Sequence, residues 1–505
     1  SLTSVASLLE ATGKTDEALA AYQGAERLLA ALAPRAPETL SALADCRSRL
    51  GWFLSTIGRS DEALAVYRLA RVDQESLAEL PGAANEARRD LTATINRIGA
   101  LLWQTGKPAE AEAEFRKALA IRQKLAVDNP AVTEFRSALA QSHFNLGILL
   151  SQTGKLSAAE AGHRNALAIR QKLAYDNPAV TLFRSDLAMS HVCLGILLSQ
   201  TGKPSEAETE HRKALAIEQK LADDNPAVTQ FRSALAYSHE ALGYLLFPTG
   251  KAAEAEAEYR KALAIRQKLA DDNPAVTEFR NALADCHSNL GCILPQTGKP
   301  AAAESEHQKA LAIRQKLAEA EPGNPAWRNA IGVSLTSLGD VDTEAGRFDT
   351  AIARFRESLA IHERLAHDHP TITAYRRELA SALTGLGRAE HRAGRRAAAV
   401  EPLNRAATLW EAIAEPDIEA RYELARNYTL LAAAAADSRS GLSAADTAAT
   451  AQRAMAALRQ AVAAGFHDLA KLRTDPDLAP LRDRDDFRLL LLDLAMPVEP
   501  FAPGR

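Results

Sequence analysis

The stretch Asn129–Asp176 reads NPAVTEFRSALAQSHFNLGILLSQTGKLSAAEAGHRNALAIRQKLAYD. Closely similar stretches begin at Asn177, Asn225 and Asn273, so one 48-residue unit is repeated almost unchanged. The Gly of its Thr-Gly-Lys turn recurs, 48 residues apart, at Gly58, Gly106, Gly154, Gly202, Gly250, Gly298, Gly346 and Gly394, and Gly13 precedes this series by 45 residues. A fixed period of this length is typical of repeat architectures. The sequence therefore predicts tandem structural repeats in place of the about three domains that chain length alone suggests.

Each unit is expected to fold as two helices. Asn129 and Pro130 suit an N-cap and a first helical position, so the leading helix is expected to run from there to about Gln152. Gly154 then suits a left-handed C-terminal cap, and a trailing helix follows to about Ala174. Apolar residues recur three and four apart along one face of both helices. A lone hairpin cannot bury such a face, so neighbouring hairpins are predicted to stack as an all-α solenoid.

Small residues stand at fixed distances from the turn glycine. The residue five positions after it is Ala in all nine units, and the residue seven positions before it is Gly in every unit except the first, which has Val5-Ala6 there. Nine positions after the turn glycine comes a ring or another large residue, and twelve after comes Ala, except at Ser358. Small side chains allow helices to approach closely, so this pattern indicates tight packing within each hairpin.

This pattern resembles the tetratricopeptide repeat, over residues 1 to about 412. The units exceed the standard repeat length, and they resemble the long-helix variety found in kinesin light chains. The resemblance implies a right-handed superhelical α-solenoid whose leading helices line a concave, peptide-binding groove. Asp342 and Glu390 depart from it, because they replace a Leu found in other units. A buried carboxylate needs a partner or water, so packing in the eighth and ninth units is expected to differ.

The domain organisation expected from the period has three parts. Residues 1–412 form nine units, of which the first is truncated, residues 413–465 form a degenerate tenth hairpin, and residues 466–505 form a helical capping tail. The tenth hairpin is predicted to have helices from about Asp417 to Ala435 and from Ser443 to Ala464. The tail, with Asp475-Pro476-Asp477-Leu478, resembles the C-terminal region of repeat-bearing bacterial serine/threonine protein kinases. That resemblance implies a kinase domain upstream of this chain.

Composition excludes several classes of protein. The 505 residues carry a formal net charge of -4, and 47% of them are hydrophobic, which is a globular composition. A nearly neutral chain lacks the basic field of most nucleic-acid binders, so no nucleic-acid partner is expected. We find no apolar run of about 18 residues, and four cysteines are too few for a disulfide scaffold. A soluble, cytoplasmic protein that does not contact a membrane is the expectation.

Catalytic and metal sites find no support in the sequence. His143, His191, His239 and His287 recur once per unit, but they are 48 residues apart and have no second ligand nearby on the same helix. We interpret these rings as packing elements and predict no metal and no cofactor. The chain has no Gly-x-Ser-x-Gly elbow and no kinase Gly-rich loop, HRD or DFG sequence. No enzyme activity is predicted for this chain.

The remaining candidate is the groove. Positions ten, six, three and two residues before each turn glycine are expected to face it, and they are mostly uncharged until the last two units. The candidate peptide-binding residues are Trp52, Asn96, Trp103, Gln104, Phe144, Ile148, Gln152, Val192, Gln200, Tyr244, Phe247, Gln296, Arg388 and Arg392. Aromatic anchors beside amides are typical of surfaces that bind protein segments. The alternative is that Trp52 and Trp103 pack against neighbouring helices.

The sequence thus predicts a non-catalytic scaffold that binds a peptide or protein segment. Its rival is a substrate-recognition or regulatory region of a serine/threonine protein kinase. RNA binding would require a basic surface and polar reading positions, and self-association through near-identical units stays open. The basic run Arg116, Lys117, Arg122 and Lys124, which recurs in later units, is interpreted as a solvated outer face with ion pairs along the helix.

Overall fold

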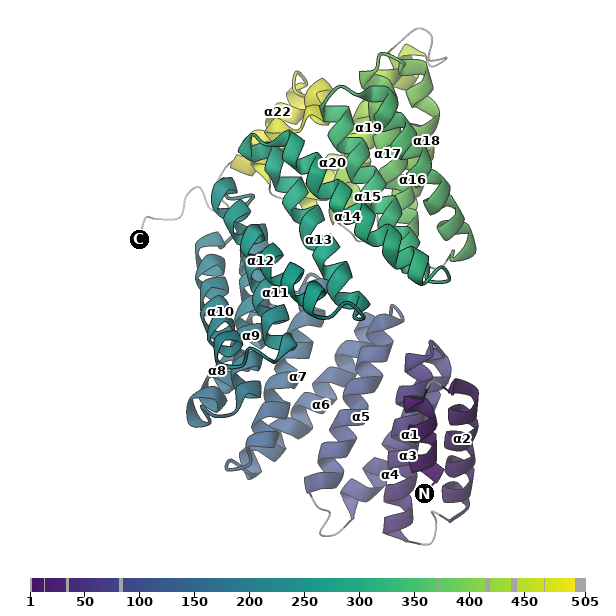
Figure 1. The fold of residues 1–505 in the computed structure, drawn as a ribbon, viewed down its shortest axis with the longest axis vertical. Coiled ribbons are helices and arrows are strands. Elements are labelled where there is room, and N and C mark those ends of the chain that lie inside the picture. Colours follow the sequence, from purple (N-terminus) through teal and green to yellow (C-terminus); the bar gives the residue numbers. More distant parts are fainter. Residues whose placement is uncertain are drawn as a thin grey trace. The chain divides into compact units, whose positions relative to one another are not determined.

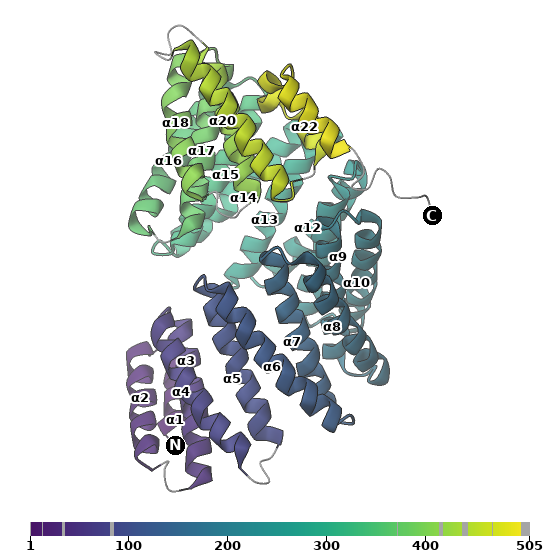
Figure 2. The same cartoon turned by 180° about the vertical axis from the view of Figure 1, so that it is seen from behind.

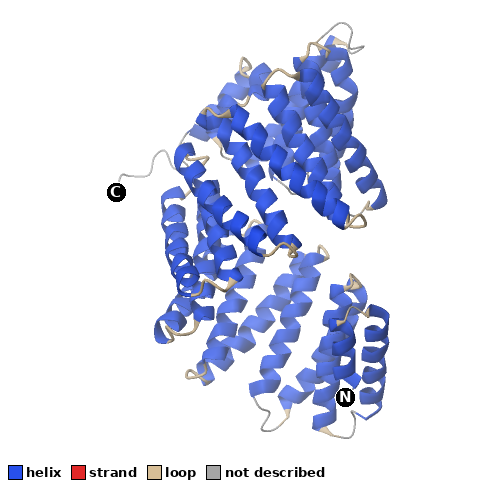
Figure 3. Cartoon of the chain, in the orientation of Figure 1, coloured by secondary structure: helices blue, strands red, loops and turns tan. Residues whose placement is uncertain are grey.

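The computed structural model describes residues 2–12, 14–32, 36–80, 85–370, 372–413, 418–436, 443–466 and 468–495. Within these ranges the chain forms helices and turns and no strand (Figure 3). The predicted all-α solenoid of tandem hairpins is confirmed. Gly13 and the last ten residues lie outside the described residues.

The helices alternate between leading and trailing members of antiparallel hairpins (Figure 1). The leading helices are α1 (Leu2–Ala11), α3 (Pro37–Thr56), α5 (Asn85–Gln104), α7 (Thr133–Gln152), α9 (Thr181–Gln200), α11 (Thr229–Leu246), α13 (Thr277–Ile293), α15 (Pro325–Glu344), α17 (Thr373–Arg392) and α19 (Ile418–Ala435). The trailing helices are α2 (Thr15–Leu32), α4 (Ser60–Glu79), α6 (Pro108–Asp128), α8 (Leu156–Asp176), α10 (Pro204–Asp224), α12 (Ala252–Asp272), α14 (Pro300–Ala320), α16 (Phe348–Asp368), α18 (Arg396–Ile413) and α20 (Ala444–Ala463). A short tail follows, with α21 (Leu469–Thr474), η4 (Pro476–Leu481) and α22 (Asp485–Ala495).

The chain divides into two compact units, Ser1–Glu258 and Tyr259–Arg505, here called unit 1 and unit 2. In each unit the hairpins follow one another in chain order (Figures 1 and 2). Leading helices of neighbouring hairpins contact each other, as α7 contacts α9 and α15 contacts α17. We call the surface of a unit formed by its leading helices, on the side away from the trailing helices, its leading-helix face.

The turn inside each hairpin has the predicted glycine geometry. Gly154 has φ of 74°, a left-handed conformation that favours glycine, and the seven other turn glycines of the 48-residue series have φ between 74° and 80°. Lys155 N donates to Leu150 O at 2.8 Å, which satisfies a carbonyl of the last helical turn. The sequence pattern at Gly154 therefore identified the hairpin turn correctly.

The small residues do bring the two helices of a hairpin together. The nine alanines five positions after the turn glycines are all fully buried. A Cβ atom added at Gly99 would lie 2.8 Å from the ring of Phe115, and one added at Gly195 would lie 2.8 Å from the ring of His211. The large residue of the trailing helix thus packs directly on the glycine of the leading helix, and any side chain there would force the helices apart.

The expected role of Asn129 and Pro130 as the start of a helix is wrong. α7 begins at Thr133, with Val132 in the N-cap position, whereas Asn129 caps the C-terminus of α6. Both the backbone N–H and the side-chain Nδ2 of Asn129 donate to Leu125 O, at 3.1 and 3.0 Å. Pro130 then lies in a turn between the helices. The Asn side chain adds a second hydrogen bond to a carbonyl of the preceding helix, which competes with its use as an N-cap.

The substituted positions in later units are accommodated by local pairs. Asp342 is fully buried, and its carboxylate accepts ion pairs from Arg347 at 2.5 Å and Arg354 at 2.6 Å. Two leading helices end early beside a proline: α11 ends at Leu246, two residues before Pro248, and α13 is followed by the 3₁₀ helix η2 (Leu294–Thr297), which contains Pro295.

Among the residues that the structure describes, one helix is long enough and apolar enough to cross a membrane. This is α9, whose mean hydropathy reaches 1.3, and it corrects the expectation that no such segment occurs. α9 is also the leading helix of a repeat hairpin with α10. Its Val192 is fully buried, and its His191 pairs with Glu210 of α10. Packing within the repeat therefore accounts for these two residues, whereas Leu182, Met189 and Ile196 of the same helix are exposed.

Candidate functional site

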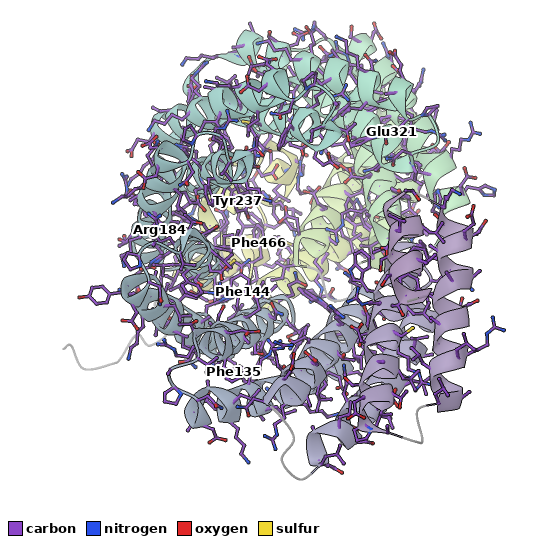
Figure 4. The ribbon with its side chains drawn as sticks, turned by 60° about the horizontal axis from the view of Figure 1, so that its bottom comes forward. Phe135, Phe144, Arg184, Tyr237, Glu321 and Phe466 are labelled. Carbon is purple, nitrogen blue, oxygen red and sulfur yellow. The ribbon has the colours of Figure 1, made fainter. Side chains whose placement is uncertain are left out.

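The leading-helix face of unit 1 exposes large apolar side chains. At the position six residues before the turn glycine, Trp52 is 48% exposed and Tyr244 is 76% exposed. Ile196 occupies the same position on α9 and is also exposed, as are Met189 and Tyr237, which each stand thirteen residues before a turn glycine. Phe144 and Tyr237, from α7 and α11, are labelled in Figure 4. Exposed apolar residues that line up over successive helices are typical of a surface that binds a partner.

Two candidate residues do not lie on this surface. Phe144 is 9% exposed, with the guanidinium of Arg170 4.6 Å from its ring centre and the ring of His163 packed edge-on at 5.7 Å. Val192 is fully buried. Both stand ten residues before the turn glycine, which places them about 80° around the helix from the position two before it. The expectation that they face the groove is therefore wrong.

Uncharged side chains join neighbouring repeats along one edge of the face. Trp103 Nε1 donates to Gln152 Oε1 at 3.0 Å, and Ser151 Oγ donates to Gln200 Oε1 at 3.3 Å. Trp103 is half-buried and packs against the core, so the packing alternative holds for this residue and not for Trp52. The other candidates divide between half-buried and exposed positions: Asn96, Ile148 and Phe247 are half-buried, and Gln104 and Gln296 are exposed.

Arginines of the trailing helices hold the leading helices together, which the sequence analysis missed. Arg170 is 4% exposed, and its guanidinium donates to Ser190 Oγ at 2.9 Å, Asp186 O at 3.1 Å and Gln141 Oε1 at 2.8 Å. The three acceptors come from α7 and α9, so Arg170 of α8 bridges both. Arg122 makes the same kind of contacts one repeat earlier, and burial lowers its pKa to about 10.

The interpretation of this run as a solvated outer face is therefore wrong for Arg122. Its equivalents stand 48 residues apart, but the exposed Lys124 recurs with the same period, so recurrence alone did not distinguish the arginine that bridges the helices. One unit breaks the series, because Glu218 takes the place of the arginine. Glu218 is 2% exposed. Burial raises the pKa of its carboxyl group to about 7, although a hydrogen bond with Ser238 acts to lower that pKa. The bridge between α9 and α11 consequently lacks a guanidinium.

In unit 2, the tail covers part of the leading-helix face. Asp477 of η4 is 2% exposed and accepts ion pairs from Arg426 at 2.7 Å, Arg388 at 3.3 Å and Arg392 at 3.6 Å. Asp475 pairs with Arg426 as well, at 3.0 Å. Arg388 and Arg392 therefore do not line an open groove, contrary to the expectation. They are engaged by the chain's own tail.

The rest of the tail packs onto α19. Phe466, labelled in Figure 4, stacks on the ring of Tyr422 with 4.4 Å between ring centres. Tyr422 Oη donates to Asp475 at 2.6 Å. Leu478 and Leu481 are buried in the same core cluster as Tyr422. Aromatic stacking, charge and apolar burial together hold this segment in place.

The histidine series forms buried pairs with glutamates. His191, His239 and His287 place Nδ1 2.5 to 2.6 Å from a carboxylate oxygen of the trailing helix. His143 has Gly162 where the others have Glu, and burial lowers its pKa. Among the described residues, no group of three or more His, Cys, Asp or Glu side chains is arranged to hold a metal ion. The rings serve packing between the two helices of a hairpin.

Family models described as tetratricopeptide repeat match residues 90–172, 236–269, 283–325 and 332–371. The chain contains tetratricopeptide repeats. A search of curated proteins found no match. The resemblance of the tail to those of repeat-bearing kinases stays a prediction.

Solved structures resemble the chain as well. The apo form of RapI is 10% identical, with a TM-score of 0.50 over 84% of this chain and 99% of that one. BtubC (BKLC) from P. vanneervenii is 22% identical, with a TM-score of 0.41 over 50% of this chain and 92% of that one. A Podosopora anserina putative kinesin light chain with nearly identical TPR-like repeats is 20% identical, with a TM-score of 0.34 over 46% and 99%. At these identities the likeness concerns the fold alone.

Proposed function

We propose that this tetratricopeptide-repeat chain is a non-catalytic scaffold that binds a segment of a partner protein along the leading-helix face of unit 1. The observation that carries the proposal is the tail in unit 2. Arg388 stands six residues before its turn glycine and Arg392 two before it, so they are the equivalents of Tyr244 and of Gln200 in unit 1. The chain's own segment Asp475–Leu481 already lies on these positions, which supports the same use of the open positions in unit 1.

The composition of the open positions specifies the partner. From α7 to α9, the positions six and two before the turn glycine carry Ile148, Ile196, Gln152 and Gln200, and none is charged. Tyr244 extends the apolar series on α11. Apolar anchors flanked by amides suit a segment whose apolar side chains are buried while its backbone groups bond to Gln side chains. The proposed ligand is therefore an apolar, uncharged stretch of a protein.

Selection from a phage-displayed peptide library on the full chain tests this proposal. We expect the selected peptides to be apolar, and the double variant Ile196→Ser, Tyr244→Ser to weaken their binding about tenfold or more, as loss of buried anchors does. Tyr175→Ser is the matched control, because Tyr175 is 85% exposed but lies on the trailing helix α8. Equal binding by the double variant and the wild type would refute the assignment of this face.

A further inference from the structure

Three exposed apolar side chains form a line along α9. Leu182, Met189 and Ile196 are 61%, 37% and 37% exposed, and they stand seven residues apart. Seven residues make almost two helical turns, so side chains at this spacing lie on nearly the same side of a helix. From Leu182 to Ile196 the line is about 21 Å long, at 1.5 Å per residue. We call these three residues the α9 stripe.

The neighbouring leading helix α11, which contacts α9, has the same arrangement. Its exposed Tyr237 and Tyr244, here called the α11 pair, stand seven residues apart, and Gln230 precedes them by seven. Both lines occupy the positions twenty, thirteen and six residues before a turn glycine. Every other 48-residue repeat has a charged residue at one or more of these positions, such as Glu134 in α7 and Asp285 in α13. Two neighbouring uncharged lines therefore occur at one place in the repeat series.

The direction of these lines indicates the conformation of the segment that fits them. They run along the helix axes, whereas the positions six before each turn glycine, such as Ile196 and Tyr244, run across the helices. An α-helix presents apolar side chains three, four and seven residues apart on one face, which matches a line of residues seven apart. A helix lying lengthwise covers the whole α9 stripe. An extended segment that crosses α9 at Ile196 leaves Leu182, about 21 Å away, exposed.

The charged residues that border the two lines are acidic. Residues three or four positions from a member of a line lie beside it on the helix surface. Among these positions the charged residues are Asp186 on α9 and Glu240 on α11, and none is Lys or Arg. Arg170 of α8 offsets part of the charge of Asp186, but it is 4% exposed and lies beneath the surface. A partner with basic groups beside its apolar face complements this charge.

We propose that the α9 stripe and the α11 pair bind an amphipathic α-helix of the partner protein, which lies lengthwise and carries basic residues beside its apolar face. The inference rests on the proposed function and specifies the bound segment: its uncharged stretch is one face of a helix. In a helix only the terminal backbone groups lack partners. The exposed Gln200, four residues after Ile196 at the end of the stripe, is placed to donate to a terminal carbonyl.

The test compares three labelled peptides of identical charge on the full chain, by fluorescence anisotropy. The helical probe has about 20 residues of Ala and Lys, with leucines alternately three and four residues apart on one face. In the scrambled probe the same residues are reordered so that the leucines surround the helix. In the proline probe two central alanines become prolines, which break a helix. We expect saturable binding of the helical probe, and binding about tenfold or more weaker for the other two.

One variant distinguishes a lengthwise helix from a segment that crosses the helices. Leu182→Ser should weaken the helical probe about tenfold, because a buried anchor is lost at the far end of the α9 stripe. Val72→Ser is the matched control, because Val72 is 55% exposed on the trailing helix α4 and should not affect binding. Circular dichroism checks that both variants keep the helical content of the wild type.

The outcomes separate this inference from the proposed function. Equal binding of the helical and proline probes, or an unchanged affinity in Leu182→Ser, overturns the lengthwise helix. The proposed function still stands in that case if the library peptides lose affinity in the Ile196→Ser, Tyr244→Ser variant. Sedimentation of the chain alone tests another occupant: a dimer that Leu182→Ser dissociates would give the α9 stripe to a second copy and overturn the inference.

Discussion

The two units use the same repeat position for opposite purposes. In unit 1 the position six before the turn glycine carries the exposed Trp52, Ile196 and Tyr244, and the half-buried Ala100 and Ile148. In the last 48-residue repeat of unit 2 it carries Arg388, which is covered by the tail and pairs with Asp340 and Asp477. The difference shows that the repeat position does not by itself determine whether a side chain is exposed: Arg388 is covered because Asp477 of the tail pairs with it, whereas Tyr244 is 76% exposed.

The largest expected effect concerns the part of unit 2 where the tail lies on Arg388 and Arg392. In Asp477→Ala, the guanidinium groups of Arg388, Arg392 and Arg426 lose their common counter-charge in a buried site. Removing one partner of a buried ionic cluster costs about 3 to 5 kcal/mol. We expect the free energy of unfolding of unit 2 to fall by about that amount, measured as earlier loss of helical signal in urea.

The control for this change is Asp483→Ala, whose carboxylate is fully exposed and pairs with Arg488 at the surface. It should change the unfolding midpoint little, because exposed ion pairs contribute at most about 1 kcal/mol. Similar midpoints for the two variants would show that the tail is held by its leucines alone.

Two buried carboxylates, one in each unit, are expected to make the stability of the two units depend on pH in opposite ways. Burial would raise the pKa of Asp477, but Arg388 and Arg426 outweigh it, and the pKa lies below the usual 3.8. Its contribution to stability is present above pH 3.8 and is lost as the pH falls through the lowered value. Glu218 is buried without a described ion pair, and its pKa is raised from 4.5 to about 7. Its effect on stability has the opposite sign.

Glu218→Gln should stabilise unit 1 in a pH-dependent way. A raised carboxyl pKa means that the folded state binds the proton more tightly, so wild-type stability falls as the pH rises from 4.5 to 7 and stays low above it. The variant lacks this loss, and at pH 8 we expect a gain of up to roughly 3 kcal/mol that vanishes near pH 4. Urea unfolding at the two pH values measures it, with Glu110→Gln as the control. A gain of equal size at both pH values would contradict the assignment.

The period predicted the elements that depend on residues within one unit. The turn at Gly154, the contact between Gly195 and His211, and the buried alanine five positions after each turn glycine all follow from the local pattern. The ends of the helices were predicted less accurately than the turns. The helix expected to begin at Ser443 does begin there, with Ser443 as the N-cap of α20, whereas Asn129 is the C-cap of α6 and does not begin α7. One residue type can satisfy either helix end, so the pattern alone did not decide between them.

The candidate site depended on contacts that the period does not contain. Arg388 and Asp477 are 89 residues apart, and nothing in the repeat indicates that the tail returns to α17. Phe144 was assigned to the surface by its position in the unit, but the guanidinium of Arg170, on the trailing helix of the same hairpin, covers its ring. The sequence left open whether the tryptophans are exposed or packed, and the structure exposes Trp52 while Trp103 packs against the core.

The smallest expected effect concerns the open face. Tyr244→Ser removes a side chain that is 76% exposed, so little packing is lost in the free protein. We expect it to change the free energy of unfolding by less than about 0.5 kcal/mol, as surface substitutions usually do, measured by urea unfolding. Arg388→Ala, the equivalent change in unit 2, should be clearly destabilising because it leaves Asp477 with one guanidinium fewer. If Tyr244→Ser proves as destabilising as Arg388→Ala, the ring of Tyr244 is needed by the fold itself, and its exposure says nothing about a partner.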